Sequence, residues 1–241
     1  MRDTTKYIVT FVLIMTGIVA FILAGMNTFL KPIHDLNEAV YNKKSILLSI
    51  EDEFDTPVSA MSVEQVQEIF NSDQMESLAI DAEGNVVEGV SAEEVLLEAE
   101  LKKPKAEQRY PMYVYEKSDG SRIYIISIRG QGLWDAIWGS VALEEDLSTI
   151  VGASFDHAGE TPGLGAEIKD NPSFPERFVG KKIYDEGGDF TSVQIVKGII
   201  NQPDHQVEAI SGATITMNGV TEMLRNGIQN YEPYFKKIQQ Q

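Results

Sequence analysis

Residues 211–216, SGATIT, combine three side-chain hydroxyls with two small residues. These five residues are Ser211, Gly212, Ala213, Thr214 and Thr216. The apolar-rich stretch HQVEAI comes before the segment and a helical pattern follows, so it joins a strand to a helix. The first turn of a helix carries unpaired N–H groups and the positive end of the helix dipole. The pattern therefore indicates either an ordinary helix cap or a site for a phosphate group.

Two more glycine-containing segments could contribute to the same chemistry. RGQGLWDAIWG (129–139) places Trp134 and Trp138 after two closely spaced glycines, and these rings could stack on an aromatic cofactor. HAGETPGLGAEI (157–168) contains a Pro/Gly-rich loop whose backbone could approach a flat ligand closely. The alternatives are buried tryptophans and a plain turn. SGATIT lacks the lysine of the GxxxxGK[ST] phosphate loop, so a Walker-type site is excluded.

Composition narrows the possible chemistry. The 241-residue chain has no cysteine, which excludes disulfides, cysteine-bound metal clusters and a thiol nucleophile. Its three histidines are far apart in the sequence, and we predict no metal site and no catalytic triad. The formal net charge of −17 argues against nucleic-acid binding, which requires a basic surface.

Residues 7–26, YIVTFVLIMTGIVAFILAGM, form an uncharged stretch about as long as a transmembrane helix needs to be. No convincing signal-peptide cleavage site follows, so we predict an uncleaved, single-pass anchor. Gly17, Ala20 and Ala24 lie on one side of it and could pack against another membrane helix. Flanking lysines and arginines do not decide the orientation, but large domains are translocated largely regardless of them. We expect a short cytoplasmic tail and a large outer domain.

The remaining pattern predicts an α+β fold with a mostly antiparallel sheet and flanking helices after the anchor. Helices are expected at 34–50, 62–70, 91–101, 173–183 and 214–228, with capping boxes beginning at Ser62 and Ser91. Strands are expected in 78–87, 112–117, 122–128, 138–155, 191–199 and 205–210. We divide the chain into a tail and anchor (1–30), a helix-rich linker with the first part of the soluble domain (31–110), and a ligand-binding domain (111–241).

The motifs SGAT–ITMNGV, ETPGLG and GLW, behind a single N-terminal span, together resemble one family. It is the FMN-binding domain family, in the NqrC form found in the bacterial sodium-translocating NADH:quinone oxidoreductase. The resemblance covers the anchor, the acidic linker in outline, and the C-terminal half from about residue 130. It implies that Thr214 carries FMN through a phosphoester bond, attached by a flavin transferase that uses FAD.

The resemblance also implies which other residues surround the cofactor. Ser211, Gly212, Ala213 and Thr216 would lie near the phosphate. Along the isoalloxazine ring it implies Trp134, Glu160, Thr161, Gly163, Leu164 and Gly165. In one respect the chain departs from the family: Glu208 stands where the transferase target pattern usually begins with aspartate.

The implied function is electron relay through covalent FMN in a complex that oxidises NADH, reduces quinone and pumps sodium. The chain itself would bind neither NADH nor quinone. Its partners would be the lipid bilayer, integral membrane and flavin or iron–sulfur subunits, and the flavin transferase. The location would be the bacterial inner membrane, with the large domain on the periplasmic side. An RnfG-type component of a ferredoxin:NAD oxidoreductase is one alternative, and a non-redox, membrane-tethered binding domain is another.

Overall fold

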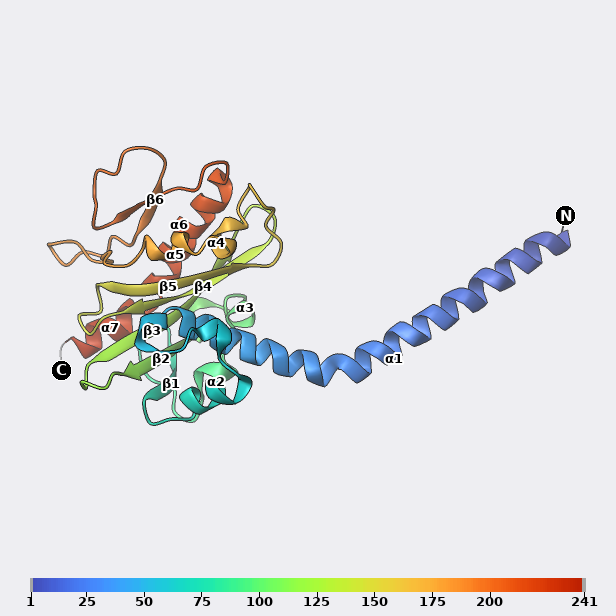
Figure 1. Cartoon of the computed structure of the whole chain (residues 1–241), viewed down its shortest axis with the longest axis horizontal. Coiled ribbons are helices and arrows are strands. Elements are labelled where there is room, and N and C mark those ends of the chain that lie inside the picture. The colour runs from blue at the N-terminus through green and yellow to red at the C-terminus, as the bar shows by residue number, and fades with distance from the viewer. Residues whose placement is uncertain (1, 240–241) are drawn as a thin grey trace. The chain divides into compact units, whose positions relative to one another are not determined.

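The computed structural model describes residues 2–239 and contains two compact units (Figure 1). One unit ends at Asn42 and the other begins at Lys43. A single helix, α1 (Arg2–Leu48), forms the first unit and contributes its last turns to the second.

Helix α1 is the one helix among the described residues that is long and apolar enough to cross a membrane. Its most apolar window has a mean hydropathy of 2.6, and none of that window is buried. The predicted span and the predicted helix at 34–50 are parts of this one continuous helix, which runs through Pro32.

The second unit is built on a five-stranded antiparallel sheet in the order β1-β2-β3-β4-β5. This sheet confirms the predicted fold class, including the hairpin at 112–128 and the strand pair after it. The strands are β1 (Met75–Asp81), β2 (Arg109–Glu116), β3 (Arg122–Gln131), β4 (Ala136–Leu143) and β5 (Ile150–His157). Two short strands, β6 (Gln194–Val196) and β7 (Gln206–Glu208), pair in parallel as a separate sheet.

Both faces of the large sheet are buried. Alternate residues of a strand point to opposite faces, so neighbouring residues belong to different cores. On β2, Met112 and Val114 belong to one core, whereas Tyr113 and Tyr115 belong to the other. Helices α4, α5 and α6 cover one face, and α2 covers the opposite face together with the last turn of α1 (Figure 1). The helices after α1 are α2 (Val63–Phe70), α3 (Leu97–Glu100), α4 (Glu167–Asp170), α5 (Ser173–Glu176), α6 (Thr214–Gln229) and α7 (Glu232–Ile238).

Local predictions had mixed outcomes. The capping box at Ser62 is present: its side chain accepts from the Gln65 N–H, and the Gln65 side chain accepts from the Ser62 N–H. The second capping box is wrong, since Ser91 makes no side-chain cap and precedes only a 3₁₀ turn (Ala92–Glu94). There the Ala92 N–H donates instead to the Ser77 hydroxyl of β1.

Besides the strands β6 and β7, which have three residues each, three other elements are shorter than expected. The predicted helix at 173–183 is the single turn α5, and the predicted helix at 91–101 contains only the four-residue α3. The second strand expected in 78–87 is reduced to one isolated bridge between Ile80 and Val86.

Helix α6 is fixed against both sheets. In the middle of the helix, Thr221 Oγ1 accepts a hydrogen bond of 3.1 Å from the Ile195 N–H of β6. Just beyond its end, the Tyr231 hydroxyl lies 2.8 Å from the Pro111 carbonyl oxygen and 2.9 Å from that of Ser127. The first half of α6, which contains the predicted acceptor threonine, is therefore held beside β6.

Candidate functional site

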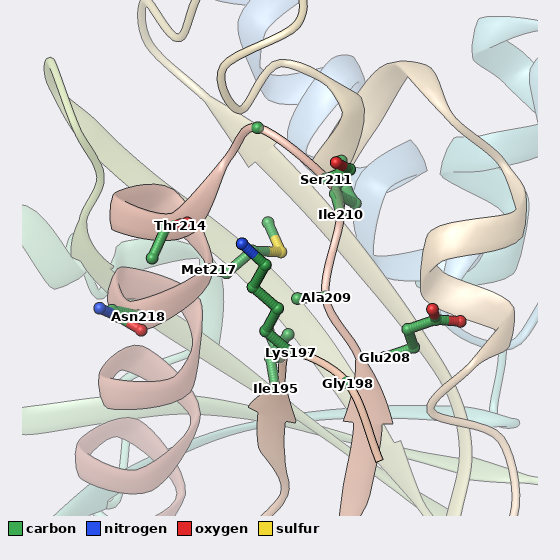
Figure 2. A pocket seen from close by; sticks show the side chains of 11 residues that line it. Ile195, Lys197, Gly198, Glu208, Ala209, Ile210, Ser211, Thr214, Met217 and Asn218 are labelled. Carbon is green, nitrogen blue, oxygen red and sulfur yellow. The ribbon is translucent and has the colours of Figure 1, made fainter. Parts of the chain in front are cut away.

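A pocket of about 330 Å³ opens where β6 and β7 end and α6 begins (Figure 2). Because the two strands run parallel, both carboxyl ends meet here, an arrangement that frequently forms ligand sites in α/β sheets. The lining residues are Ile195, Lys197, Gly198, Glu208, Ala209, Ile210, Ser211, Gly212, Thr214, Met217 and Asn218. Three of the residues predicted from the SGATIT motif, Ser211, Gly212 and Thr214, are among them.

The start of α6 is not capped by a hydroxyl. Its N-cap residue is Ala213, which makes no side-chain capping hydrogen bond, and Thr214 is the first helical residue. The simple cap interpretation of SGATIT is therefore wrong. Thr214 and Ser211 are exposed and line the pocket, close to the helix start, where the helix dipole favours an anion.

Gly212 explains how the loop 161–165 comes so close to this turn. Its φ is +88°, a left-handed conformation that glycine adopts without strain. A Cβ at Gly212 would lie 2.8 Å from the Gly163 carbonyl oxygen. The second and third glycine-containing segments are thus in direct backbone contact.

Glu160 joins all three segments from below the surface. Its side chain is buried, with Oε2 2.5 Å from the hydroxyl of the equally buried Thr216. Its other oxygen, Oε1, accepts 2.9 Å from the Trp134 N–H in the β3–β4 turn. The Thr216 hydroxyl also lies 3.1 Å from the Leu164 carbonyl oxygen. Neither Glu160 nor Thr216 lines the pocket.

Electrostatics favour the ionised form of Glu160. Burial alone raises the pKa of this carboxyl, but hydrogen bonds from Thr216 and from the backbone of residues 133–135 outweigh burial and leave the pKa lowered. Glu167 likewise has a lowered pKa, chiefly because its carboxylate accepts the Gly163 N–H. Both carboxylates thus hold the loop 160–167 in place as hydrogen-bond acceptors.

The lowered pKa of Glu160 predicts a pH-dependent contribution to stability. The ionised group stabilises the fold above the pKa of an unfolded glutamate, about 4.5, and this contribution is lost as pH falls through the lower folded-state pKa. We expect Glu160→Gln to cost about 1.5–3 kcal/mol of unfolding free energy at neutral pH. The difference from wild type should shrink below pH 4.5. Urea unfolding of the full chain in detergent, followed by tryptophan fluorescence between pH 7 and 3, measures it; a difference that stays constant over this range contradicts the prediction.

Lys197 is a site residue that the sequence reasoning missed. It follows β6, is exposed, and has no hydrogen bond or ion pair with any part of the chain between residues 2 and 239. Figure 2 shows its side chain extending past Met217 towards the start of α6, whereas the Glu208 carboxylate points the other way. No motif marks this lysine, because the parallel pairing of β6 and β7 brings it to the site.

Most of the remaining predicted residues lie on the surface around these loops. Trp134 is 64% exposed and Leu164 is 42% exposed, although both are large and apolar. Thr161 and Gly163 are also exposed, whereas Gly165 is buried against the Glu160–Thr216 pair, where a Cβ would lie 2.7 Å from Glu160 Oε2. Neither Trp134 nor Leu164 belongs to the hydrophobic cores, so both side chains are free to cover an apolar ring of a ligand.

These features fit a flavin mononucleotide. The pocket offers an exposed hydroxyl at Thr214, a free cation at Lys197, and the open N–H groups of a helix start, all of which suit a phosphate group. Its volume is within the range of small-molecule sites. Among the described residues there is no cluster of three or more histidine, aspartate or glutamate side chains suited to a metal ion.

Comparison with known proteins identifies the class of protein. The FMN-binding domain family matches residues 132–229, which include the pocket, two of the glycine-containing segments and most of the segment 129–139. The fold and the site together therefore define a flavoprotein domain that binds FMN.

Full-length relatives make the assignment more specific. The NqrC protein of the Na(+)-translocating NADH-quinone reductase of Pseudomonas aeruginosa is 30% identical over 240 residues, which cover 92% of this chain and 91% of that protein. Its counterpart in Neisseria meningitidis serogroup A is 28% identical over 249 residues, which cover 98% of this chain and 95% of that protein. The chain belongs to the NqrC family of the Na(+)-translocating NADH-quinone reductase, whose members are flavoprotein subunits of an oxidoreductase complex.

Solved structures agree with this assignment. The crystal structure of NqrC from Parabacteroides distasonis superimposes with a TM-score of 0.72 at 35% identity, covering 86% of this chain and 96% of that one. NqrC of Shewanella oneidensis, at 22% identity and a TM-score of 0.68, shows the same fold over 83% of this chain. Neither the RnfG-type alternative nor the non-redox binding domain is favoured by these comparisons.

Proposed function

We propose that this chain relays electrons through FMN bound covalently to Thr214. The observation that carries the proposal is the exposed Thr214 hydroxyl at the uncapped start of α6, lining a pocket inside an FMN-binding domain. Bound FMN supplies the one- and two-electron transfer that such a relay requires.

Attachment requires a separate flavin transferase with FAD as the donor. In the balanced reaction, Thr214 Oγ1 forms a bond to the phosphorus of the FMN half and the pyrophosphate bond breaks. AMP leaves, and the hydroxyl proton passes to solvent. The product is a phosphodiester with one negative charge, which suits the helix start and Lys197.

Fluorescence on a denaturing gel tests the proposal. The full chain is expressed in membranes with and without an active flavin transferase, and the gel is viewed under ultraviolet light. We expect a fluorescent band only with the transferase, and an intact mass increased by one FMN minus water. A dark band despite a transferase that labels a known acceptor would refute covalent attachment.

Lys197 should accelerate attachment by stabilising the phosphate. Because the lysine is exposed, its contribution is at most about 1 kcal/mol, or roughly five-fold in rate. We expect Lys197→Gln to be labelled up to about five times more slowly and to lose part of the wild-type dependence on salt. Lys236→Gln, which removes an exposed lysine paired with Glu232, is the matched control and should be labelled normally. Equal labelling rates for wild type and Lys197→Gln would show that Lys197 does not contribute to flavin attachment.

The cellular arrangement follows from the anchor and the family. We infer that α1 crosses the bacterial inner membrane once, with the tail in the cytoplasm and the large domain in the periplasm. The partners would be the integral membrane subunits and the flavin or iron–sulfur subunits of the same complex. Gly17, Ala20 and Ala24 are the residues that would allow another membrane helix to approach closely.

A further inference from the structure

Glu160 and Thr216 make the most deeply buried polar contact of the site, although neither side chain lines the pocket. Glu160 is 5% exposed and Thr216 is completely buried. They are 56 residues apart in sequence, and the distance between Glu160 Oε2 and the Thr216 hydroxyl is 2.5 Å. A buried carboxylate is costly unless it is well hydrogen-bonded, so a contact of this kind needs an explanation.

The contact joins the first turn of α6 to the loop 160–165 and to the β3–β4 turn. Thr216 is in the first turn of α6, two residues after Thr214, and its hydroxyl also contacts the Leu164 carbonyl of the loop 161–165. Glu160 reaches the β3–β4 turn through the Trp134 N–H. The backbone of Glu160 is fixed in turn, because its N–H donates 3.1 Å to His157 Nδ1.

The surrounding backbone leaves room only for this pair. A Cβ at Gly132 would lie 2.5 Å from Glu160 Oε1, and one at Gly165 would lie 2.7 Å from Oε2. The two glycines thus allow the β3–β4 turn and the loop 161–165 to close over the carboxylate. Removing either partner would leave a buried polar group without its hydrogen bond.

The pair also separates the two threonines of SGATIT. Thr214 is exposed and its side chain makes no hydrogen bond within the described part of the chain, whereas the Thr216 hydroxyl is buried and hydrogen-bonded. A transferase that meets this segment finds one free threonine hydroxyl, on a helix turn that the buried pair holds in place.

We propose that Glu160 and Thr216 are a positioning pair that fixes the first turn of α6 so that the Thr214 hydroxyl is presented to the flavin transferase. The pair also withdraws Thr216 from the reaction. Neither residue touches the reacting atoms. This inference rests on the proposed covalent attachment at Thr214.

The test measures transfer of flavin to the unlabelled full chain in detergent, with purified transferase and FAD. Thr216→Val keeps the shape of the side chain and removes the hydroxyl, and Thr216→Ser restores the hydroxyl. We expect Thr216→Val to lower kcat about 10- to 100-fold, since small misplacements of a reacting group have effects of this size. The KM for FAD should not change, because FAD binds to the transferase. Thr216→Ser should recover most of the rate.

Tyr231→Phe is the matched control for loss of stability alone. It removes another buried hydroxyl with two carbonyl partners, just beyond the far end of α6. It should be labelled at the wild-type rate despite a lower melting temperature. If Thr216→Val does not fold by circular dichroism, Glu160→Gln replaces it, with the same expected fall in kcat.

The outcomes separate the two proposals. If wild type is not labelled, covalent attachment itself fails. If wild type is labelled and the folded Thr216→Val or Glu160→Gln variant is labelled equally fast, only the positioning pair is overturned. An equal slowing of Tyr231→Phe, or no recovery in Thr216→Ser, also overturns it.

Discussion

Thr214→Ala is expected to remove all covalent flavin from the chain and leave the fold unchanged. The Thr214 hydroxyl is the only acceptor we assign, and it makes no hydrogen bond within the described part of the chain that the substitution would break. Surface substitutions of this kind usually change the unfolding free energy by less than about 0.5 kcal/mol. Alanine is also a favourable residue in the first turn of a helix. Gel fluorescence and intact mass measure the label, and urea unfolding measures the fold.

Two neighbouring hydroxyls make the result specific. Ser211 is exposed and lines the same pocket, so Ser211→Ala is the matched control and should keep its flavin. Thr216 lies two residues further along but is completely buried, so no label should move to it when Thr214 is removed. Label persisting in Thr214→Ala would move the acceptor elsewhere. In the assembled complex, the same substitution should abolish NADH-driven quinone reduction while the chain still co-purifies.

The parts of this fold that depend on local pattern could be predicted from the sequence. The strands β2 and β3 are rich in tyrosine, valine and isoleucine, and both are present at the expected places. The start of α6 at Thr214 also agrees with the prediction, because a glycine turn separates an apolar stretch from a helical pattern. The capping box at Ser62 could be predicted for the same reason. After Ser91, in contrast, the Ala92 N–H donates to the Ser77 hydroxyl of β1, and no capping box forms.

The parts that depend on distant contacts could not be predicted. Glu160 was expected at the cofactor; its carboxylate points to Thr216, a residue 56 positions away that no local pattern pairs with it. Lys197 gave no signal at all, because a lone lysine after a short strand is normally solvated. The segment 31–110 was expected to be a helix-rich linker with the first part of the soluble domain, but the sequence did not show which of its residues pack on the sheet. Leu47, Val66 and Phe70 belong to the second core, on the far face of the sheet.

Gly219→Ala tests local pattern against distant contacts, because the two predict changes of opposite sign in the unfolding free energy. Gly219 is inside α6, where intrinsic helix propensity favours alanine by about 1 kcal/mol. A Cβ at this position, however, would overlap the carbonyl oxygen of Gln131 in β3. That atom belongs to a paired strand and cannot move aside as the end of a side chain could. We therefore expect a net loss of about 1–3 kcal/mol in unfolding free energy.

The same substitution should also slow flavin attachment, which connects the packing of α6 to the site. Relief of the clash requires α6 to move away from β3, and this movement displaces its first turn and Thr214. Gly159→Ala is the matched control: a Cβ there meets nothing within 4 Å, so stability should be unchanged or slightly higher and labelling normal. Urea unfolding and the rate of flavin transfer, measured on both variants, give the answer. A Gly219→Ala chain more stable than wild type would mean that helix propensity outweighs the close approach, and that α6 can shift without disturbing the acceptor.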